Sequence, residues 1–245
     1  MSSKSSHMNT AKIRLIAYSF SVCAMLYGSE FEPEYRLEER EKTTRTTKEG
    51  SIVRTDVNPK TPVLKNEEGN YILQKGGVYT VGGTIYGDII GRGDIGLRME
   101  NGTVINGCVN LQCATGNVSR KYPTNPRIWI DYNCRATINN PDSIALQTGG
   151  YGPTYIEYCG TLTVNGDVSG SIQLTDGGTA LIVNGNINDG FAYLKKETWF
   201  RVKGTIGDEV TIKAEFDQNG DEAYITESYS TDGDYKVFYG GDDPE

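Results

Sequence analysis

The stretch around Trp129 holds the residues best placed to do chemistry on a sugar. Trp129 and Asp131 alternate with Ile128 and Ile130, so the ring and the carboxylate would lie on the outward face of one strand. An indole can stack on a sugar ring while a neighbouring carboxylate exchanges a proton. If the chain is an enzyme, the catalytic candidates are Asp131, Arg127 and Arg135. The candidate binding residues are Trp129, Asp131 and Tyr132.

The same residues also have a purely structural interpretation. Hydrolysis of a glycan requires two converging carboxylates, and lyase chemistry requires acids that hold calcium beside a base. The other candidate acids for this face are Asp88 and Asp94. With so few acids, the favoured interpretation is that Trp129 covers a loop and Asp131 is a solvated strand residue.

A second candidate, for metal binding, lies near the C-terminus. The alternating oxygen ligands of a calcium loop would be Asp217, Asn219 and Asp221. Glu222 stands where such a loop requires glycine, and Ser228 stands where it requires glutamate. A hairpin turn at Asn219-Gly220 accounts for the same residues without a bound ion. We therefore predict no metal site and no cofactor.

Histidine and cysteine chemistry is limited in this sequence. His7 is the single histidine, which excludes a Ser–His–Asp arrangement in the body of the chain. The five cysteines match no zinc spacing: Cys23, Cys108, Cys113, Cys134 and Cys159. Without Cys23 the remaining four could form two disulfides. Equally, Cys108 could be a small residue at the edge of a strand, and the sequence leaves both open.

The residues around Trp129 must be positioned by strands, and the clearest strand pattern in the sequence is a repeat between Leu162 and Ile212. Its copies begin at Leu162, Leu181 and Phe200, a constant interval of 19 residues. Within each copy the apolar residues alternate, which predicts strands and excludes a helical repeat. A fixed interval of short strands is typical of a β-solenoid, in which like residues of successive coils stack. The predicted buried ladders are Val164, Val183 and Val202, and Val168, Ile187 and Ile206.

The odd interval requires one corner per coil where the alternation breaks. The run Asp176-Gly177-Gly178 provides it, because glycine can adopt a positive φ. Outward positions would form polar ladders without a catalytic pair: Asn165, Asn184 and Lys203, and Asp167, Asn186 and Thr205. Similar strands recur from Asn70 onward at longer intervals, with Ile144 and Leu146 among them. Loops at 116–126 and 149–153 would leave the coils.

The run Asn101-Gly102-Thr103-Val104-Ile105-Asn106-Gly107 resembles a coil of the right-handed parallel β-helix proteins. That superfamily includes pectate lyases, polysaccharide hydrolases, phage tail spikes and surface adhesins. The short coils around Val164-Asn165-Gly166-Asp167-Val168-Ser169-Gly170 also resemble bactofilin-type solenoids. The resemblance implies a shape, an all-β parallel β-solenoid with right-handed coils, and assigns no site.

Four segments are expected along the chain. Residues 1–28 form a leader or N-terminal anchor, because Lys12 and Arg14 precede an apolar run too short and too polar to span a bilayer. Residues 29–69 form a charged linker, residues 70–212 the β-solenoid of about seven coils, and residues 213–245 an acidic antiparallel β cap. From Asp208 onward the chain has twelve acidic residues and only two lysines. This negative charge argues against nucleic acid as a partner.

We therefore expect a non-enzymatic structural or adhesive surface protein, part of a virion or of a secreted cell envelope. Its partners would be proteins or surface glycans, and a spike-like protein would form a homotrimer. The alternative is a polysaccharide-binding or polysaccharide-processing β-helix enzyme centred on Trp129 and Asp131. A third possibility, self-assembly through open sheet ends, is disfavoured by the acidic cap.

Overall fold

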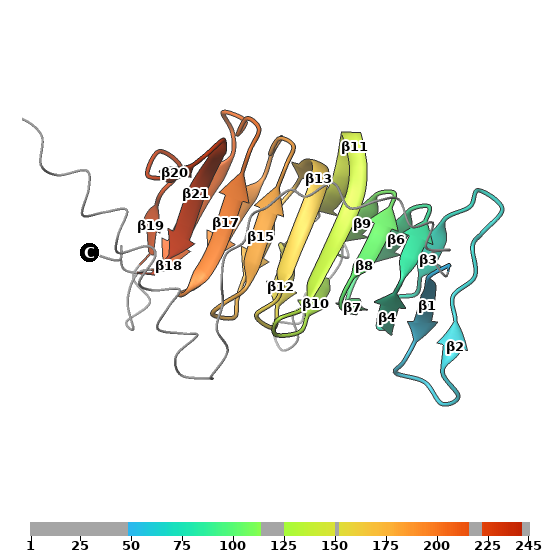
Figure 1. Cartoon of the computed structure of the whole chain (residues 1–245). Coiled ribbons are helices and arrows are strands. Elements are labelled where there is room, and N and C mark those ends of the chain that lie inside the picture. Colours follow the sequence, from blue (N-terminus) through green and yellow to red (C-terminus); the bar gives the residue numbers. More distant parts are fainter. Residues whose placement is uncertain (1–48, 114–124, 150–151, 216–221, 242–245) are drawn as a thin grey trace, which may run out of the picture. The chain divides into compact units, whose positions relative to one another are not determined.

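The computed structural model describes residues 49–113, 125–149, 152–215 and 222–241. Throughout these ranges the chain forms strands and turns, with no helix (Figure 1). The expected leader at 1–28 and the calcium candidates Asp217, Asn219 and Asp221 lie outside the described residues, as does most of the predicted loop at 116–126. The fold class is therefore all-β.

The strands form two mixed sheets in which most pairs are parallel. The ten-stranded sheet has the order β19 (Glu222–Tyr224), β18 (Thr211–Glu215), β16 (Phe191–Leu194), β14 (Ile172–Leu174), β12 (Thr154–Glu157), β10 (Arg127–Ile130), β7 (Gly96–Met99), β4 (Val78–Gly82), β1 (Ser51–Arg54) and β2 (Thr61–Pro62). The eleven-stranded sheet has the order β20 (Ser230–Asp232), β21 (Tyr235–Gly240), β17 (Thr198–Val202), β15 (Ala180–Val183), β13 (Thr161–Ser169), β11 (Arg135–Gly149), β9 (Val109–Gln112), β6 (Ile89–Arg92) and β3 (Tyr71–Leu73). Two further strands of the eleven-stranded sheet lie outside this linear order: β8 (Thr103–Asn106) pairs with β11 and with β5 (Thr84–Tyr86).

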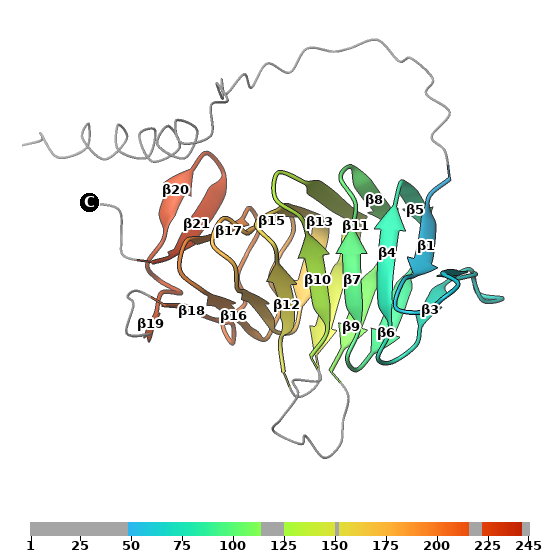
Figure 2. The same ribbon diagram turned by 90° about the horizontal axis from the view of Figure 1, so that it is seen from below.

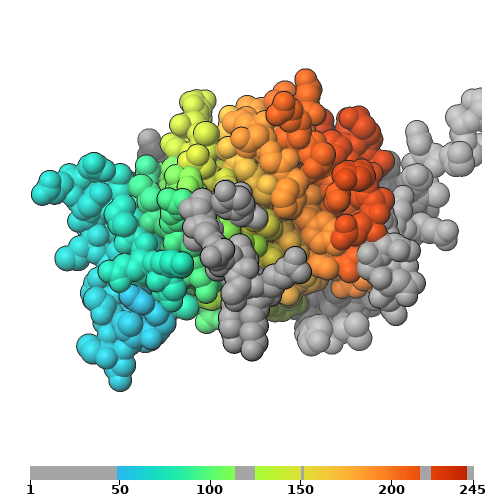
Figure 3. Space-filling model, turned by 180° about the vertical axis from the view of Figure 1, so that it is seen from behind, coloured from blue at the N-terminus to red at the C-terminus, as the bar shows by residue number. Residues whose placement is uncertain are grey.

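From β10 to β18 successive strands alternate between the two sheets, and each pairs in parallel with the strand two places later. Figures 1 and 2 show these strands side by side in the order of the sequence. Figure 3 shows the same progression from the opposite side.

The first predicted buried ladder is present, and the second is present with its last member, Ile206, only partly buried. Val183 pairs with Val164 on one side and with Val202 on the other, and all three are fully buried. Parallel bridges also join Val168 to Ile187 and Ile187 to Ile206. Inward side chains of both sheets belong to one hydrophobic cluster that extends from Ile52 to Phe238. Like residues therefore stack on like residues at the 19-residue interval, as the repeat predicts.

The predicted corner is also present, but it does not depend on glycine alone. Gly178 has a φ of +87°, and the register aligns it with Cys159 and Glu197, whose φ values are +61° and +62°. Asn133 has a φ of +59° at the equivalent corner before β11. The turn recurs at the same place in these four successive repeats, so the repeat geometry imposes the left-handed conformation on whichever residue the sequence supplies.

Antiparallel pairs occur at both ends of the stack. At the C-terminal end β21 pairs with β17 and β20, and β19 pairs with β18. At the N-terminal end β1 pairs antiparallel with β4 and β2. These two strands lie in the range 29–69, which we expected to be a linker. The structure differs there because Ile52 is buried in the core and anchors a strand within a mostly polar stretch.

The N-terminal hairpin contains a carboxylate with a shifted pKa. Asp56 accepts hydrogen bonds from Arg54 Nε (2.9 Å) and from the Val78 amide (3.1 Å). The hydrogen bond with Arg54 contributes most to lowering the Asp56 pKa from its ordinary value of 3.8 to about 2. The stabilisation from this carboxylate is therefore complete above its ordinary pKa and is lost as pH falls through about 2.

We expect Asp56→Asn to lower the melting temperature at neutral pH, because the charge-assisted bonds are lost. The difference from the unmodified chain should shrink between about pH 4 and pH 2 as the native carboxylate becomes protonated. Thermal denaturation across that pH range checks this. A difference that stays constant down to pH 2 would contradict the lowered pKa.

Candidate functional site

Trp129 lies on the outward face of the ten-stranded sheet, in the middle of β10. Its neighbours Ile128 and Ile130 are fully buried, whereas Trp129 is half-buried and Asp131 is exposed. The register places Trp129 beside Arg98 of β7 and Glu157 of β12. Two strands distant in sequence therefore supply the side chains around the indole.

A glycine and a carboxylate hold the indole in place. A Cβ at Gly96 would lie 2.3 Å from Cη2 of Trp129, so the ring occupies the space that any other residue at position 96 would fill. On the other side Trp129 Nε1 donates a hydrogen bond of 2.7 Å to Glu157 Oε2. The indole therefore lies against the backbone of β7 and is tethered to β12.

Both carboxylates next to Trp129 have arginine partners. Arg127 Nη1 donates to Glu157 Oε1 at 3.1 Å, and Arg98 Nη2 lies 3.5 Å from Asp131 Oδ1. The Arg127–Glu157 pair positions Trp129, because Glu157 also accepts the indole hydrogen bond. The Arg98–Asp131 pair is about half exposed, at 47 % and 53 % of the two side chains.

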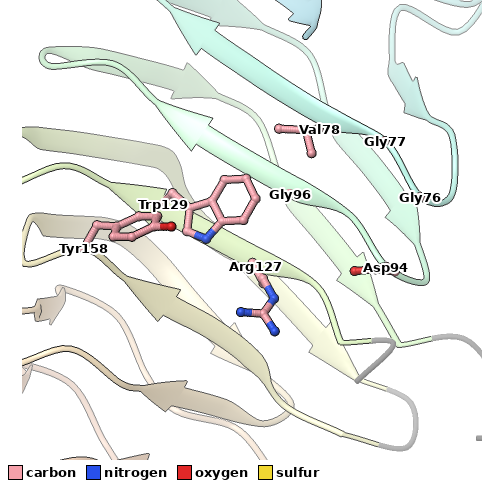
Figure 4. Close-up of a pocket in the computed structure, with 8 residues that line it drawn as sticks. All are labelled: Gly76, Gly77, Val78, Asp94, Gly96, Arg127, Trp129 and Tyr158. Carbon is pink, nitrogen blue, oxygen red and sulfur yellow. The ribbon is translucent and has the colours of Figure 1, made fainter. Parts of the chain in front are cut away.

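An open hollow of about 340 Å³ lies beside the indole (Figure 4). Its lining residues are Gly76, Gly77, Val78, Asp94, Gly96, Arg127, Trp129 and Tyr158. The ring centres of Trp129 and Tyr158 are 6.0 Å apart, with the planes tilted by 48°. The Arg98 guanidinium lies 5.9 Å from the centre of the Tyr158 ring. Two aromatic rings and several charged groups thus surround a region of bare backbone.

The structure brings some of the residues predicted from the sequence together and separates others. Arg127, Trp129 and Asp131 share one outward face, and Asp94 lines the hollow. Arg135 begins β11 in the other sheet, and Tyr132 is a 66 % exposed turn residue that does not line the hollow. Asp88 lies between β5 and β6 of the other sheet, where its Oδ1 accepts a hydrogen bond of 2.8 Å from the Cys108 amide.

Sequence reasoning missed Gly96, Arg98, Glu157 and Tyr158. Gly96, Arg98 and Glu157 occupy outward positions of β7 and β12, so alternation is their signal. Tyr158 lies just after β12 at a bend with a φ of +79°, where alternation gives no signal. The sequence could not show which residues of these strands face Trp129, because the distance along the chain between the coils varies here.

Among the residues with described positions, no group of three or more His, Cys, Asp or Glu side chains could hold a metal ion. The four cysteines with described positions also form no such group: Cys108, Cys134 and Cys159 are free thiols, and Cys113 Sγ donates to Asn125 Oδ1. Burial raises the pKa of Cys108 to about 11, with Asp88 adding to the effect. The Cys108 thiol is therefore a poor nucleophile at neutral pH.

The outward face of the other sheet carries a row of asparagines. Asn139 Nδ2 donates to Asn106 Oδ1 (2.9 Å), and Asn184 Nδ2 donates to Asn165 Oδ1 (2.6 Å). In a second row Asn186 donates to Asp167, and Thr205 donates to Asn186. The predicted polar ladders are thus present at Asn165 and Asn184 and at Asp167, Asn186 and Thr205, whereas Lys203 pairs with Asp234 instead.

The described part of the chain contains no helix that is long and apolar enough to cross a membrane. No family of known sequences, no curated protein and no solved structure gives a match to this chain.

Proposed function

We propose that the chain is a non-enzymatic structural or adhesive β-solenoid, exposed on a surface such as a virion or a secreted cell envelope. The observation that carries this proposal is the continuous stacking of like residues, with Val164, Val183 and Val202 as its clearest ladder. Each coil buries its apolar row only against its neighbours, so the stack is stiff along its length. A stiff stack with a long flat face suits a spacer or an adhesive surface.

The alternation of strands between two sheets supports a solenoid. Right-handed winding is supported by the strong preference of parallel strand crossovers for that hand. Localisation at an exposed surface, with proteins or surface glycans as partners, is part of the same proposal. A homotrimer is its expected form if the protein is spike-like.

The C-terminal strands are proposed to cap the solenoid. Arg201 of β17 pairs with Asp232, and Lys203 Nζ lies 3.2 Å from Asp234 Oδ2. Phe238 of β21 is fully buried against Phe200, with ring centres 5.9 Å apart. A covered and charged end disfavours the addition of another copy there.

The pairing of Asp131 and Glu157 with arginines favours the non-enzymatic function over polysaccharide processing. The test combines two measurements on the purified full chain: light scattering, and release of reducing ends from a panel of polysaccharides. We expect a particle of defined size that releases no reducing ends. Cleavage that disappears in Asp131→Asn or Glu157→Gln would replace this proposal with the enzyme.

A further inference from the structure

We propose that the hollow beside Trp129 binds one pyranose unit of a neutral polysaccharide. This inference rests on the adhesive part of the proposed function, and it names the ligand class that adhesion would use. It involves the lining residues Trp129, Tyr158 and Asp94 and not the exposed Tyr132 in the turn after β10.

The volume of the hollow is large enough for one sugar ring. Its volume of about 340 Å³ is at the small end of the roughly 300–1,000 Å³ that ligand sites span. Gly76 and Gly96 contribute no side chain beyond the backbone, so the surface next to the indole stays open. Contact with Gly96 and the hydrogen bond to Glu157 fix the indole before any ligand arrives. A fixed aromatic surface loses little conformational entropy on binding.

The aromatic groups match the amphipathic character of a pyranose. The C–H groups of a sugar ring form an apolar surface that packs on an aromatic ring, while its hydroxyls point outward around the edge. Trp129 and Tyr158 present two rings tilted by 48° at one side of the hollow (Figure 4). Polar groups of Asp94 and Arg127 line the same hollow and can hydrogen-bond hydroxyls.

The charges around the hollow favour a neutral sugar over an acidic one. The arginines Arg98 and Arg127 are already paired with Asp131 and Glu157. Asp94 has no hydrogen-bond or ion-pair partner for its carboxylate within the described ranges. A uronate would meet this unpaired negative charge without a free arginine to offset it, whereas a hydroxyl can donate to the Asp94 carboxylate.

Trp129 itself provides the test. The chain has two tryptophans, so in the full chain carrying Trp199→Phe the indole fluorescence reports on Trp129 alone. This protein is titrated with soluble oligosaccharides of a neutral glucan, a galactan and a mannan, and with oligogalacturonate and chitosan oligosaccharide. We expect a saturable change in emission with at least one neutral oligosaccharide and none with oligogalacturonate. No response to any neutral sugar, or a response only to the acidic or the amino sugars, would overturn the inference.

Variants in the same background locate the binding. Gly96→Ala displaces the indole and should weaken binding roughly tenfold or more, whereas Gly149→Ala, whose Cβ would meet nothing within 4 Å, should not. Tyr158→Leu should weaken binding, and Tyr132→Leu should leave it unchanged. If the melting curve shows that Gly96→Ala does not fold, a second comparison replaces it. The unmodified full chain and its Trp129→Leu variant are each passed over the insoluble neutral polysaccharide, and the variant should be retained less.

The outcomes separate this inference from the proposed function. A defined particle that releases no reducing ends and does not respond to neutral sugars keeps the structural function and overturns the sugar site. Equal binding by the Tyr158→Leu and Tyr132→Leu variants also overturns the site. Release of reducing ends overturns the non-enzymatic function, whatever the fluorescence shows.

Discussion

Val183→Asp should unfold the late coils cooperatively. The Val183 side chain is 0 % exposed and stacks between Val164 and Val202. An aspartate there would be a buried charge with no partner, a change that costs about 4 kcal/mol or more. The total stability of a folded domain is only about 5–15 kcal/mol. In the proposed solenoid each coil is stabilised mainly by its neighbours, so the loss should spread along the stack.

The neighbouring residue provides a matched control. Ile182 lies on the same strand but points outward, where it pairs with Thr163 and Arg201. Ile182→Asp places the same charge where water and an arginine can reach it, so its cost should stay below about 1 kcal/mol. Chemical denaturation followed by circular dichroism compares the two variants. Equal midpoints would mean that the inward and outward faces of β15 are assigned incorrectly.

The late coils could be predicted from the sequence because their interval is constant. Leu162, Leu181 and Phe200 align without any knowledge of contacts, and the structure pairs them in that register. The middle coils could not be predicted in the same way. β11 has register shifts between Asn139 and Leu146, where the chain departs from simple alternation. Leu146 is buried as expected, but Ile144 is only half-buried and its neighbour Ala145 is buried.

The candidate site shows the same limit. Alternation was enough to place Trp129 and Asp131 on the outward face. Their partners Arg98 and Glu157 come from other coils, and residues 114–124 interrupt the interval between β9 and β10. Nothing in the sequence near Gly96 shows that the indole of Trp129, from a later strand, occupies the space above it. Pair contacts across an irregular interval depend on tertiary structure.

The glycine that recurs in each copy of the repeat has a steric explanation. A Cβ at Gly185 would lie 2.3 Å from the carbonyl oxygen of Gly166, and one at Gly204 would lie 2.4 Å from the carbonyl oxygen of Gly185. Gly107 makes the same approach to Gly87 O, at 2.5 Å. The backbones of successive coils therefore approach one another too closely at this bend for any side chain.

Gly185→Ala should consequently destabilise the protein by about 3 kcal/mol, the upper end of the usual cost of overpacking. The atom that the new methyl group would meet is backbone, and hydrogen bonds from Asn186 N to Asp167 Oδ1 and from Gly204 N to Gly185 O hold that bend in place. A loss of this size lowers the melting temperature of a chain this long by about 6–12 °C. Gly149→Ala is the matched control, because its methyl group would meet nothing within 4 Å and should change stability by less than about 0.5 kcal/mol. If calorimetry gave the two variants the same melting temperature, the coils could not be in backbone contact at Gly166 and Gly185, and the tight stacking on which the proposed stiffness depends would be wrong.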